Sequence, residues 1–412
     1  MKSNYKRLGD YIQVFDERNV NLENLPLVGL SISKKFINSV ANIIGTDLSN
    51  YKIIKQNQFA CSLMQVSRDE KIPIAMFTGI VKAIMSPAYP IFEVINDKVL
   101  LPEYLMMWFS RTEFDRQASY YAVGGVRGNL PWEDFCDMLL PIPHITKQRE
   151  IVKEYNAIDN RITLNQQLIQ KLEETAQSIY KQWFVDFEFP DENGNPYKSG
   201  GCEMVWNEEL GKEIPRSWEV RKLQSFCEKI GSGSTPTGGK ESYSISGVSL
   251  IRSTNVFDYN FSFEDLAFIN NEQANKLKNV EVYESDILFN ITGVSVARCC
   301  MVPKDILPAR VNQHVMIIRP YNTLNLAFYL LLNLCSTDSQ NALLGISQSG
   351  STREAITKSE IEDFEILLPN EEVLFKFEGL MQQTFWYKDL ISKENQKLIK
   401  LKDLFLSKLA AQ

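Results

Sequence analysis

The sequence predicts an α+β fold in which two similar domains are each followed by one long helix. Two stretches, 146–189 and 371–412, contain no proline and show apolar residues at helical spacing. Short motifs from the first half of the chain return in the second half at a nearly constant offset. Together these observations indicate a tandem duplication of a unit made of a mixed domain and a helix.

The first stretch has an apolar seam whose members recur at alternating spacings of four and three residues. The seam passes through Ile151, Tyr155, Ile158, Ile162, Asn165, Ile169, Leu172, Ala176, Ile179 and Trp183. This spacing predicts a helix with a coiled-coil face, and roughly forty residues at about 1.5 Å each make a rod of roughly 60 Å. Because such a helix gains most of its stability by burying its apolar face, another helix or another subunit must cover the seam. Asn165 is expected to set the register.

The second stretch is the candidate partner of the first. Its seam passes through Val373, Phe377, Leu380, Tyr387, Ile391, Leu398, Leu401 and Phe405. The residues that we expect at the helix or subunit interface are Ile151, Ile158, Ile162, Ile169, Leu172, Ile179, Leu380, Ile391, Leu398, Leu401 and Phe405.

Two pairs of motifs define the duplication. NQQLIQKL begins at Asn165 and NQKLIKLK at Asn395, an offset of 230 residues. WEDFCDMLLP ends at Pro141 and IEDFEILLP at Pro369, an offset of 228 residues. The predicted boundaries are 1–145 for the first domain, 146–190 for the first helix, 191–211 for a turn-rich linker, 212–370 for the second domain and 371–412 for the second helix. Each domain mixes short β-rich runs with a helical segment, and each ends with a polar loop, an apolar strand and a proline.

Composition places the chain among ordinary globular proteins, since 44% of its 412 residues are hydrophobic and 23% are charged. The polar N-terminus and the lack of a long apolar run predict neither a secretory signal nor a membrane span, and therefore a cytoplasmic protein. An odd count of seven cysteines without CxxC spacing favours reduced thiols. With only two histidines, no metal site is predicted.

The net charge of −7 argues at first against a nucleic-acid partner. The acidic excess, however, is concentrated in 191–211 and 321–370, whereas 1–145 and 212–320 are nearly balanced. Contact with DNA therefore requires that basic residues be sorted onto one face.

The order of motifs resembles that of the specificity subunit of type I restriction-modification enzymes. The matching stretches are YKRLGDYI, SPAYPIFEVI, LPEYLMMWF and HITKQREIV in the first half, and IPRSWEVRKL, GSGSTPTGG, YESDILFNITG, NQHVMIIRP and GSTREAITKSEIEDFEILLP in the second. The resemblance implies two target recognition domains separated by two antiparallel spacer helices, which read a bipartite site in double-stranded DNA. It also implies docking of two modification (methyltransferase) subunits and of restriction subunits. S-adenosylmethionine, ATP and Mg²⁺ would then be bound by those partners, and this chain would carry no catalytic residues and no cofactor.

The candidate DNA contacts are polar and basic residues of loops and strand ends. They are Lys34, Lys35, Arg68, Arg127, Gly231, Ser232, Ser234, Thr235, Arg252, Asn290, Thr292, Asn312, Gln313, His314, Ser351, Thr352 and Arg353. Residues 231–240 can offer backbone N–H groups and hydroxyls to phosphate, or can form a plain turn. Asn and Gln can read adenine, although hydrogen bonding at a strand edge explains them equally well. Arg127 and Arg353 occupy equivalent loops, from which arginine can reach phosphate or guanine.

Two other classes of function are less consistent with the sequence. A stand-alone adenine methyltransferase needs a [DNS]PP[FYW] motif, and the chain contains no Pro-Pro pair. An FxGxG loop and a Walker A loop are also missing, since Lys229 stands in place of the aromatic residue, and Ser234 and Glu241 replace the required Gly and Ser/Thr. Nuclease carboxylates form too loose a pattern to be excluded. A purely structural coiled-coil scaffold explains the helices but gives two whole domains no role.

Overall fold

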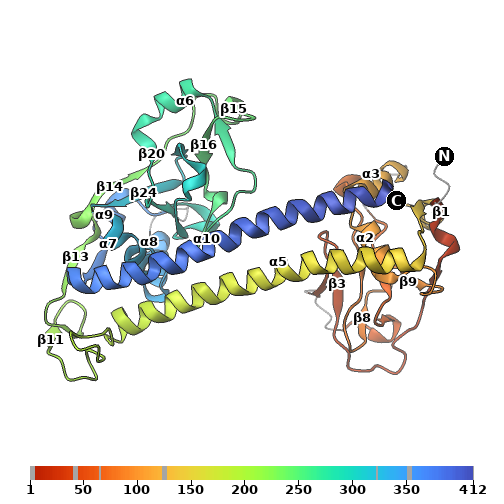
Figure 1. The fold of residues 1–412 in the computed structure, drawn as a ribbon, viewed down its shortest axis with the longest axis horizontal. Coiled ribbons are helices and arrows are strands. Elements are labelled where there is room, and N and C mark those ends of the chain that lie inside the picture. Colours follow the sequence, from red (N-terminus) through yellow and green to blue (C-terminus); the bar gives the residue numbers. More distant parts are fainter. Residues whose placement is uncertain are drawn as a thin grey trace. The chain divides into compact units, whose positions relative to one another are not determined.

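The computed structural model describes residues 5–39, 45–64, 66–122, 128–321, 323–349 and 355–411. The chain divides into two compact units, Met1–Gln166 with Ser392–Gln412, and Gln167–Ile391 (Figure 1). Each unit therefore combines one domain with parts of both long helices. Among the described residues, no helix has the length and apolar character that crossing a bilayer requires.

The first unit is built around a four-stranded antiparallel sheet with the order β2-β9-β6-β7. Its strands are β2 (Ile12–Val14), β9 (Ile91–Val94), β6 (Phe59–Cys61) and β7 (Ile74–Met76). Three strand pairs accompany it: β1 (Tyr5–Arg7) with β10 (Leu139–Pro141), β3 (Val28–Leu30) with β4 (Phe36–Asn38), and β5 (Lys52–Ile54) with β8 (Ala83–Met85). The short helices are α1 (Val66–Asp69), α2 (Pro102–Phe109), α3 (Thr112–Tyr121) and α4 (Trp132–Asp137). Phe59, Phe92 and Phe109 are fully buried, so the core lies between this sheet and α2.

The second unit contains two larger sheets. One is antiparallel, with the order β14 (Cys227–Ser232), β24 (Val315–Pro320), β21 (Ile287–Asn290) and β22 (Cys299–Met301). The other is mixed, with the order β15 (Tyr243–Ser244), β19 (Ala267–Ile269), β16 (Val248–Ile251), β23 (Ala309–Val311) and β20 (Glu281–Val282), and only β16 and β23 pair in parallel within it. Smaller pairs join β11 (Met204–Asn207) to β12 (Lys212–Pro215), β13 (Glu219–Lys222) to β25 (Glu365–Leu368), and β17 (Val256–Phe257) to β18 (Asn260–Phe261). The short helices are α6 (Asn271–Lys276), α7 (Thr323–Leu334), α8 (Thr337–Ser349) and α9 (Lys358–Glu362).

Both domains begin and end with the same arrangement. In the first, β1 pairs antiparallel with β10, and α4 precedes β10. In the second, β13 pairs antiparallel with β25, and α9 precedes β25. One long helix follows each closing strand. The predicted α+β class and the tandem duplication are therefore confirmed.

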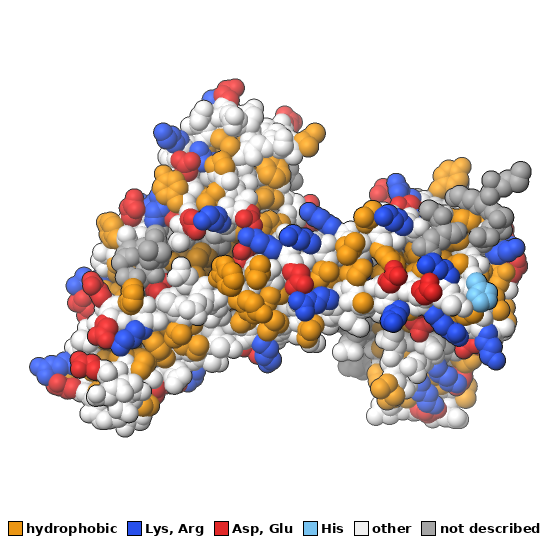
Figure 2. Space-filling model, viewed as in Figure 1, with side chains coloured by type: hydrophobic (Ala, Val, Ile, Leu, Met, Phe, Trp, Pro, Cys, Tyr) orange, Lys and Arg blue, Asp and Glu red, His pale blue; other side chains and the backbone are white. Residues whose placement is uncertain are grey.

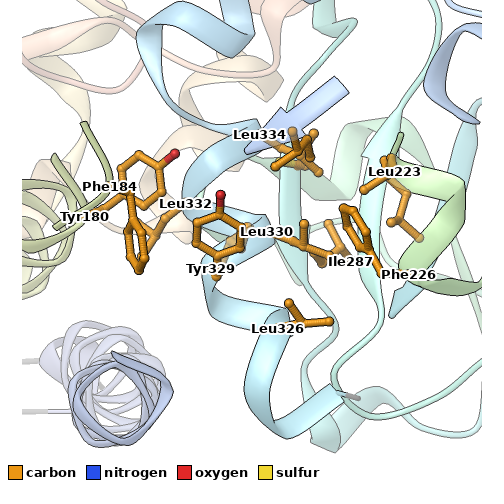
Figure 3. Close-up of a cluster of buried hydrophobic side chains, with 14 of the residues drawn as sticks. Tyr180, Phe184, Leu223, Phe226, Ile287, Leu326, Tyr329, Leu330, Leu332 and Leu334 are labelled. Carbon is orange, nitrogen blue, oxygen red and sulfur yellow. The ribbon is translucent and has the colours of Figure 1, made fainter. Parts of the chain in front are cut away.

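Helix α5 (Ile145–Tyr180) continues into a π-helical turn, Lys181–Val185, and thus ends before the predicted limit at residue 190. Every member of its predicted seam is buried or half-buried, with Ile151, Ile162, Asn165, Ala176 and Trp183 the most enclosed. The C-terminal end of α5 belongs to the core of the second domain. Figure 3 shows Tyr180 and Phe184 facing Tyr329 of α7, and the ring centroids of Phe184 and Tyr329 are 4.7 Å apart.

Helix α10 (Glu371–Lys408) departs from its predicted seam. Leu380 and Leu401 are 43% and 48% exposed, and Tyr387 is 45% exposed, so their placement in the seam between the helices is wrong. The observed seam instead passes through Phe377, Met381, Lys388, Ile391, Asn395, Leu398, Lys402, Phe405 and Leu409. Lysine occupies seam positions 388 and 402, where apolar periodicity selected the exposed neighbours Tyr387 and Leu401. At the third error it selected the exposed Leu380 in place of the buried Met381.

The two seam lysines of α10 have partners on α5, one in each unit, and Glu394 beside the seam has a further partner there. In the second unit, Lys388 Nζ lies 2.7 Å from Glu173 Oε1. In the first unit, Lys402 contacts Asp159, and the Asn165 amide donates to Glu394 Oε2 at 3.0 Å.

Ring contacts follow the same pattern. Trp183 meets Phe377 in the second unit, and Tyr155 meets Phe405 in the first. In each unit, residues late in one helix therefore contact residues early in the other, which is antiparallel pairing.

Candidate nucleic-acid interface

Four predicted DNA contacts meet in one hydrogen-bonded chain at the ends of β14, β21 and β24. The Thr235 hydroxyl donates to Gln313 Oε1, and Gln313 Nε2 lies 3.0 Å from His314 Nε2. His314 Nδ1 lies 2.8 Å from Thr292 Oγ1. Because an amide nitrogen only donates, His314 accepts at Nε2 and carries its hydrogen at Nδ1, so Thr292 Oγ1 accepts in turn. The Thr292 hydroxyl hydrogen is therefore not used for the bond to His314. The side chains of Gln313 and Thr235 are exposed.

The loop after β14 is held close to the turn between β23 and β24. The Ser234 amide donates to the Val311 carbonyl at 3.1 Å, and the Gly233 amide to Val315 at 2.9 Å. A Cβ at Gly233 would lie 2.2 Å from the Val311 carbonyl oxygen, so only glycine allows this approach. Gly231 and Ser232 lie just before this contact, in β14. The glycine-rich segment therefore serves first to bring Thr235 to Gln313.

Two predicted readers lie inside the fold. Asn290 is fully buried, and its amide donates to the Ser253 carbonyl at 3.0 Å. Asn312 is 8% exposed, and its side-chain oxygen accepts from the His314 amide at 3.1 Å. Their assignment as base readers is wrong, because both side chains are buried and do not reach the surface where a base edge would lie. Arg252 is half-buried and donates to the Asp265 carbonyl, which directs it toward the domain's own backbone.

The predicted DNA contacts of the first domain also include both a side chain inside the fold, Lys34, and an exposed one, Arg68. Lys34 has a side chain that is only 10% exposed, lies 2.8 Å from Asp115 and donates to the Phe109 carbonyl. Burial lowers the pKa of Lys34, and the Asp115 charge opposes that shift. Lys34 is therefore a core ion pair, and its prediction as a DNA contact is wrong. Arg68 is 64% exposed beside Asp69, so its guanidinium still faces solvent.

Lys35 is exposed and lines a groove of about 460 Å³ in the first unit. Asn38 at the end of β4 and Thr78 after β7 line the same groove and are also exposed. Both polar residues escaped prediction, because segments some forty residues apart meet there without a shared motif. Together with Lys35 they offer one cation, one amide and one hydroxyl.

Four predicted residues, Arg127, Ser351, Thr352 and Arg353, lie outside the described residues. The chain is described again from Ala355, which forms an antiparallel bridge with Thr292 of the hydrogen-bonded chain. Within the described ranges, no cluster of His, Cys, Asp or Glu has three members that could hold a metal ion.

Comparison with known proteins finds one family to which this chain is similar. Residues 215–402 match the family described as the type I restriction modification DNA specificity domain. The chain is 27% identical over 323 residues to the type I restriction enzyme MjaIX specificity subunit of Methanocaldococcus jannaschii, covering 77% of this chain and 70% of that protein. It is 22% identical over 362 residues to the HindI specificity subunit of Haemophilus influenzae, covering 76% and 78% of the two chains. These matches assign residues 215–402 to the DNA specificity domain, and they make the chain as a whole similar to the specificity subunits of type I restriction-modification enzymes.

The solved structures agree with this assignment at the level of the fold. The crystal structure of a type I restriction-modification S subunit from M. genitalium superposes with a TM-score of 0.57 at 12% identity, over 98% of this chain and 95% of that one. The relatives are named as the specificity subunits of such enzymes. The candidate interface of this chain should therefore be judged by the capacity to bind and discriminate DNA.

Proposed function

We propose that this chain is a specificity subunit and reads a bipartite double-stranded DNA target, with one half-site recognised by each domain. The observation that carries the proposal is the repeated construction, in which a closing strand pair in each domain leads into a long helix. Two similar domains on one chain suit a target with two separated halves, as dimeric DNA-binding proteins suit two half-sites.

In the second domain, the chain Thr235–Gln313–His314–Thr292 would supply the reading groups. An exposed glutamine can donate and accept toward an adenine edge, and hydroxyls can address either a base or a phosphate. The internal hydrogen bonds fix the rotamers before DNA arrives, which reduces the entropy lost on binding. Arg127 and Arg353 remain candidates for the loops of the two domains.

The long helices would form the docking platform for two modification subunits, with restriction subunits joining that core. S-adenosylmethionine, ATP and Mg²⁺ would be bound by these partners, while this chain contributes recognition. Exposed apolar residues on α10, such as Trp386 at 65%, support a protein-binding role for the helices. Figure 2 shows hydrophobic side chains gathered in one patch over the long helices. A stand-alone methyltransferase lacks its sequence motifs. For a nuclease, the described residues contain no group of three His, Cys, Asp or Glu that could hold a metal ion. A bare scaffold leaves the exposed hydrogen-bonded chain unexplained.

The test is a gel shift with the full chain and its modification subunit on the methylated target of the host genome. Gln313→Ala should weaken specific binding by about 1–3 kcal/mol, and non-specific binding should not change. Gln224→Ala is the matched control, since Gln224 is an exposed glutamine of the same domain that contacts Asp363. Equal binding by all three proteins would place the DNA-reading face elsewhere, and absence of any target-specific shift would overturn the proposed function.

A further inference from the structure

Two cysteines of the second unit hold their sulfur atoms close together. Cys299 begins β22, and Cys335 lies in the turn that follows α7, 36 residues later in the chain. The Sγ atoms of Cys299 and Cys335 are 3.2 Å apart, and Cys335 Sγ lies 3.5 Å from the Cys299 carbonyl oxygen. Cys299 is fully buried, whereas Cys335 is half-buried. The pair therefore joins an enclosed thiol to one that solvent can reach.

The turn between β17 and β18 holds the backbone of both cysteines. The Cys299 amide donates to Asp258 Oδ1 at 3.2 Å, and the Tyr259 amide donates to the Cys299 carbonyl at 3.0 Å. The Tyr259 hydroxyl donates to the Cys335 carbonyl at 3.1 Å. The same turn is tied to α10, because Lys388 Nζ donates to the Tyr259 carbonyl at 2.6 Å. One turn thus positions both cysteines, so the short distance between their sulfurs follows from the fold.

The neighbouring thiol of Cys300 does not compete for Cys335. Successive residues of a strand point to opposite faces of the sheet. Cys299 packs into the hydrophobic cluster around Tyr329, part of which Figure 3 shows, whereas Cys300 packs into a separate cluster around Leu250. Only one of the two adjacent thiols therefore faces the end of α7.

We propose that Cys299 and Cys335 are a thiol oxidation site, at which a peroxide converts the two thiols into a reversible disulfide. A disulfide joins its sulfurs at about 2 Å, so the two atoms need to approach by roughly 1 Å. Cys335 lies just beyond the end of a helix, where rotation of its side chain can supply that movement. Both cysteines are free thiols in the structure, so the bond forms only when an oxidant is present.

The half-buried thiol reacts first. The hydrogen bond with Cys335 and burial both raise the pKa of Cys299, so its thiol stays protonated. The Cys335 sulfur attacks hydrogen peroxide: an S–O bond forms, the O–O bond breaks, and the leaving hydroxide takes the thiol proton as water. The Cys299 sulfur then attacks the Cys335 sulfur, the S–O bond breaks, and the hydroxide leaves with the Cys299 proton as a second water. Two electrons pass from the thiols to the peroxide.

The disulfide would fasten β22 to the end of α7. Strand β22 pairs with β21, and the loop between these two strands carries Thr292 of the hydrogen-bonded chain. Closing a loop of 36 residues restricts the unfolded chain, so oxidation stabilises the second unit. The bond forms whether or not the chain reads DNA, and it therefore adds a property beyond the proposed function.

The experiment treats the full chain with hydrogen peroxide and maps its tryptic peptides by mass spectrometry without a reductant. Cleavage after Arg298 and Lys304 places Cys299 and Cys300 in one peptide, and Cys335 falls in another. We expect these two peptides to be joined, and dithiothreitol should separate them. Fragmentation of the joined peptides should assign the bond to Cys299. Oxidation should also raise the melting temperature of the second unit by about 5–10 °C.

Cys335→Ser should abolish both the joined peptides and the rise in melting temperature, because serine keeps the size of the side chain and removes the sulfur. Cys202→Ser is the matched control, since Cys202 is a half-buried thiol of the linker in the same unit. It should behave as the wild type does. Oxidation of Cys335 to a sulfinic acid without joined peptides, or a bond assigned to Cys300, would overturn the inference and leave the proposed function intact.

Discussion

The seams of the two long helices carry different residues at equivalent positions. At seven-residue steps, α5 presents Ile151, Ile158, Asn165, Leu172 and Ile179. The second helix presents Met381, Lys388, Asn395 and Lys402, followed by Leu409 in the 3-10 turn that ends it. The outer and central positions match in character, but the two positions between them are aliphatic in one helix and lysine in the other. Each lysine meets a carboxylate of α5. The two helices therefore share the spacing of the seam positions, but the lysines lie on α10 and their carboxylate partners lie on α5.

The two lysines differ in their surroundings. The side chains of Lys388 and Glu173 are 9% and 16% exposed, whereas those of Lys402 and Asp159 are 26% and 46% exposed. Burial lowers the pKa of Lys388, and the charge of Glu173 opposes that shift. The ion pair in the second unit is nearly excluded from solvent, whereas the pair in the first unit is partly hydrated. The same substitution should therefore change the stability of the two units by different amounts.

The largest expected effect comes from Lys388→Ala. Removal of the ammonium leaves the Glu173 carboxylate desolvated without its cation, which typically costs about 3–5 kcal/mol. In a unit of this size, the melting transition should fall by about 10 °C. Differential scanning calorimetry of the full chain measures this shift.

The matched variant replaces both partners, Lys388→Met with Glu173→Leu. Since apolar residues of similar volume often replace a buried ion pair without loss, this double variant should melt close to the wild type. If the double variant is as unstable as Lys388→Ala, packing rather than charge explains the single variant.

The junctions between domain and helix offer a second comparison. Gln148 of α5 and Glu378 of α10 are equivalent by the 230-residue offset, and both are buried. Gln148 accepts from the Leu101 amide at the start of α2 and donates to two backbone carbonyls. Glu378 accepts from two amides of α7 through Oε1, but its Oε2 atom is buried without a partner among the described residues. Burial raises the pKa of Glu378 to about 8, although the amides of Tyr329 and Phe328 oppose that shift.

Glu378→Gln should therefore remove a pH dependence from the second unit. A carboxyl group whose pKa is raised on folding stays protonated in the folded chain between pH 4.5 and about 8, while it ionises in the unfolded chain. Wild-type stability should thus fall across this window by at most about 1.4 kcal/mol per pH unit. The variant should lose this decline and exceed the wild type at pH 9. Parallel melting curves of the two proteins from pH 5 to 9 would contradict the assignment.

The reverse exchange, Gln148→Glu, tests the first junction by the same logic. A carboxylate there would face the carbonyls of Val99 and Pro143, to which the Gln148 amide now donates. Lost hydrogen bonds and an unpaired buried group should cost about 1–3 kcal/mol. The cost should be greater at pH 8 than at pH 5, where protonation restores one donor, and the melting temperature of the first unit measures it.

These comparisons show which features apolar periodicity can reveal. It located every seam position of α5 because nearly all of them are apolar. It failed at Lys388, Asn395 and Lys402, since a charged residue on a seam is indistinguishable in sequence from one on a solvated face until its partner is known. Lys34 failed for the same reason, because its partner Asp115 lies in a different segment. The glycine-rich loop and the Gln313–His314 pair were found as motifs, whereas the hydrogen bonds between them depend on β14 and β24 being neighbours in one sheet.

The smallest expected effect belongs to Lys402→Ala in the first unit. Lys402 and Asp159 are partly hydrated, and exposed ion pairs contribute about 0.2–1 kcal/mol because water and salt screen them. The Lys402 ammonium also lies over the Tyr155 ring, with Nζ 5.0 Å from the ring centre, so a cation–π contact is lost together with the ion pair. Lys402→Met is the more specific variant, because it keeps an apolar side chain and removes the ammonium. At 0.1 M NaCl, we expect Lys402→Met to lower stability by less than about 1 kcal/mol, and at 1 M NaCl to match the wild type. A loss as large as that of Lys388→Ala, unchanged by salt, would show that the two ends of the helix pair depend equally on their ion pairs and would refute the contrast drawn between them.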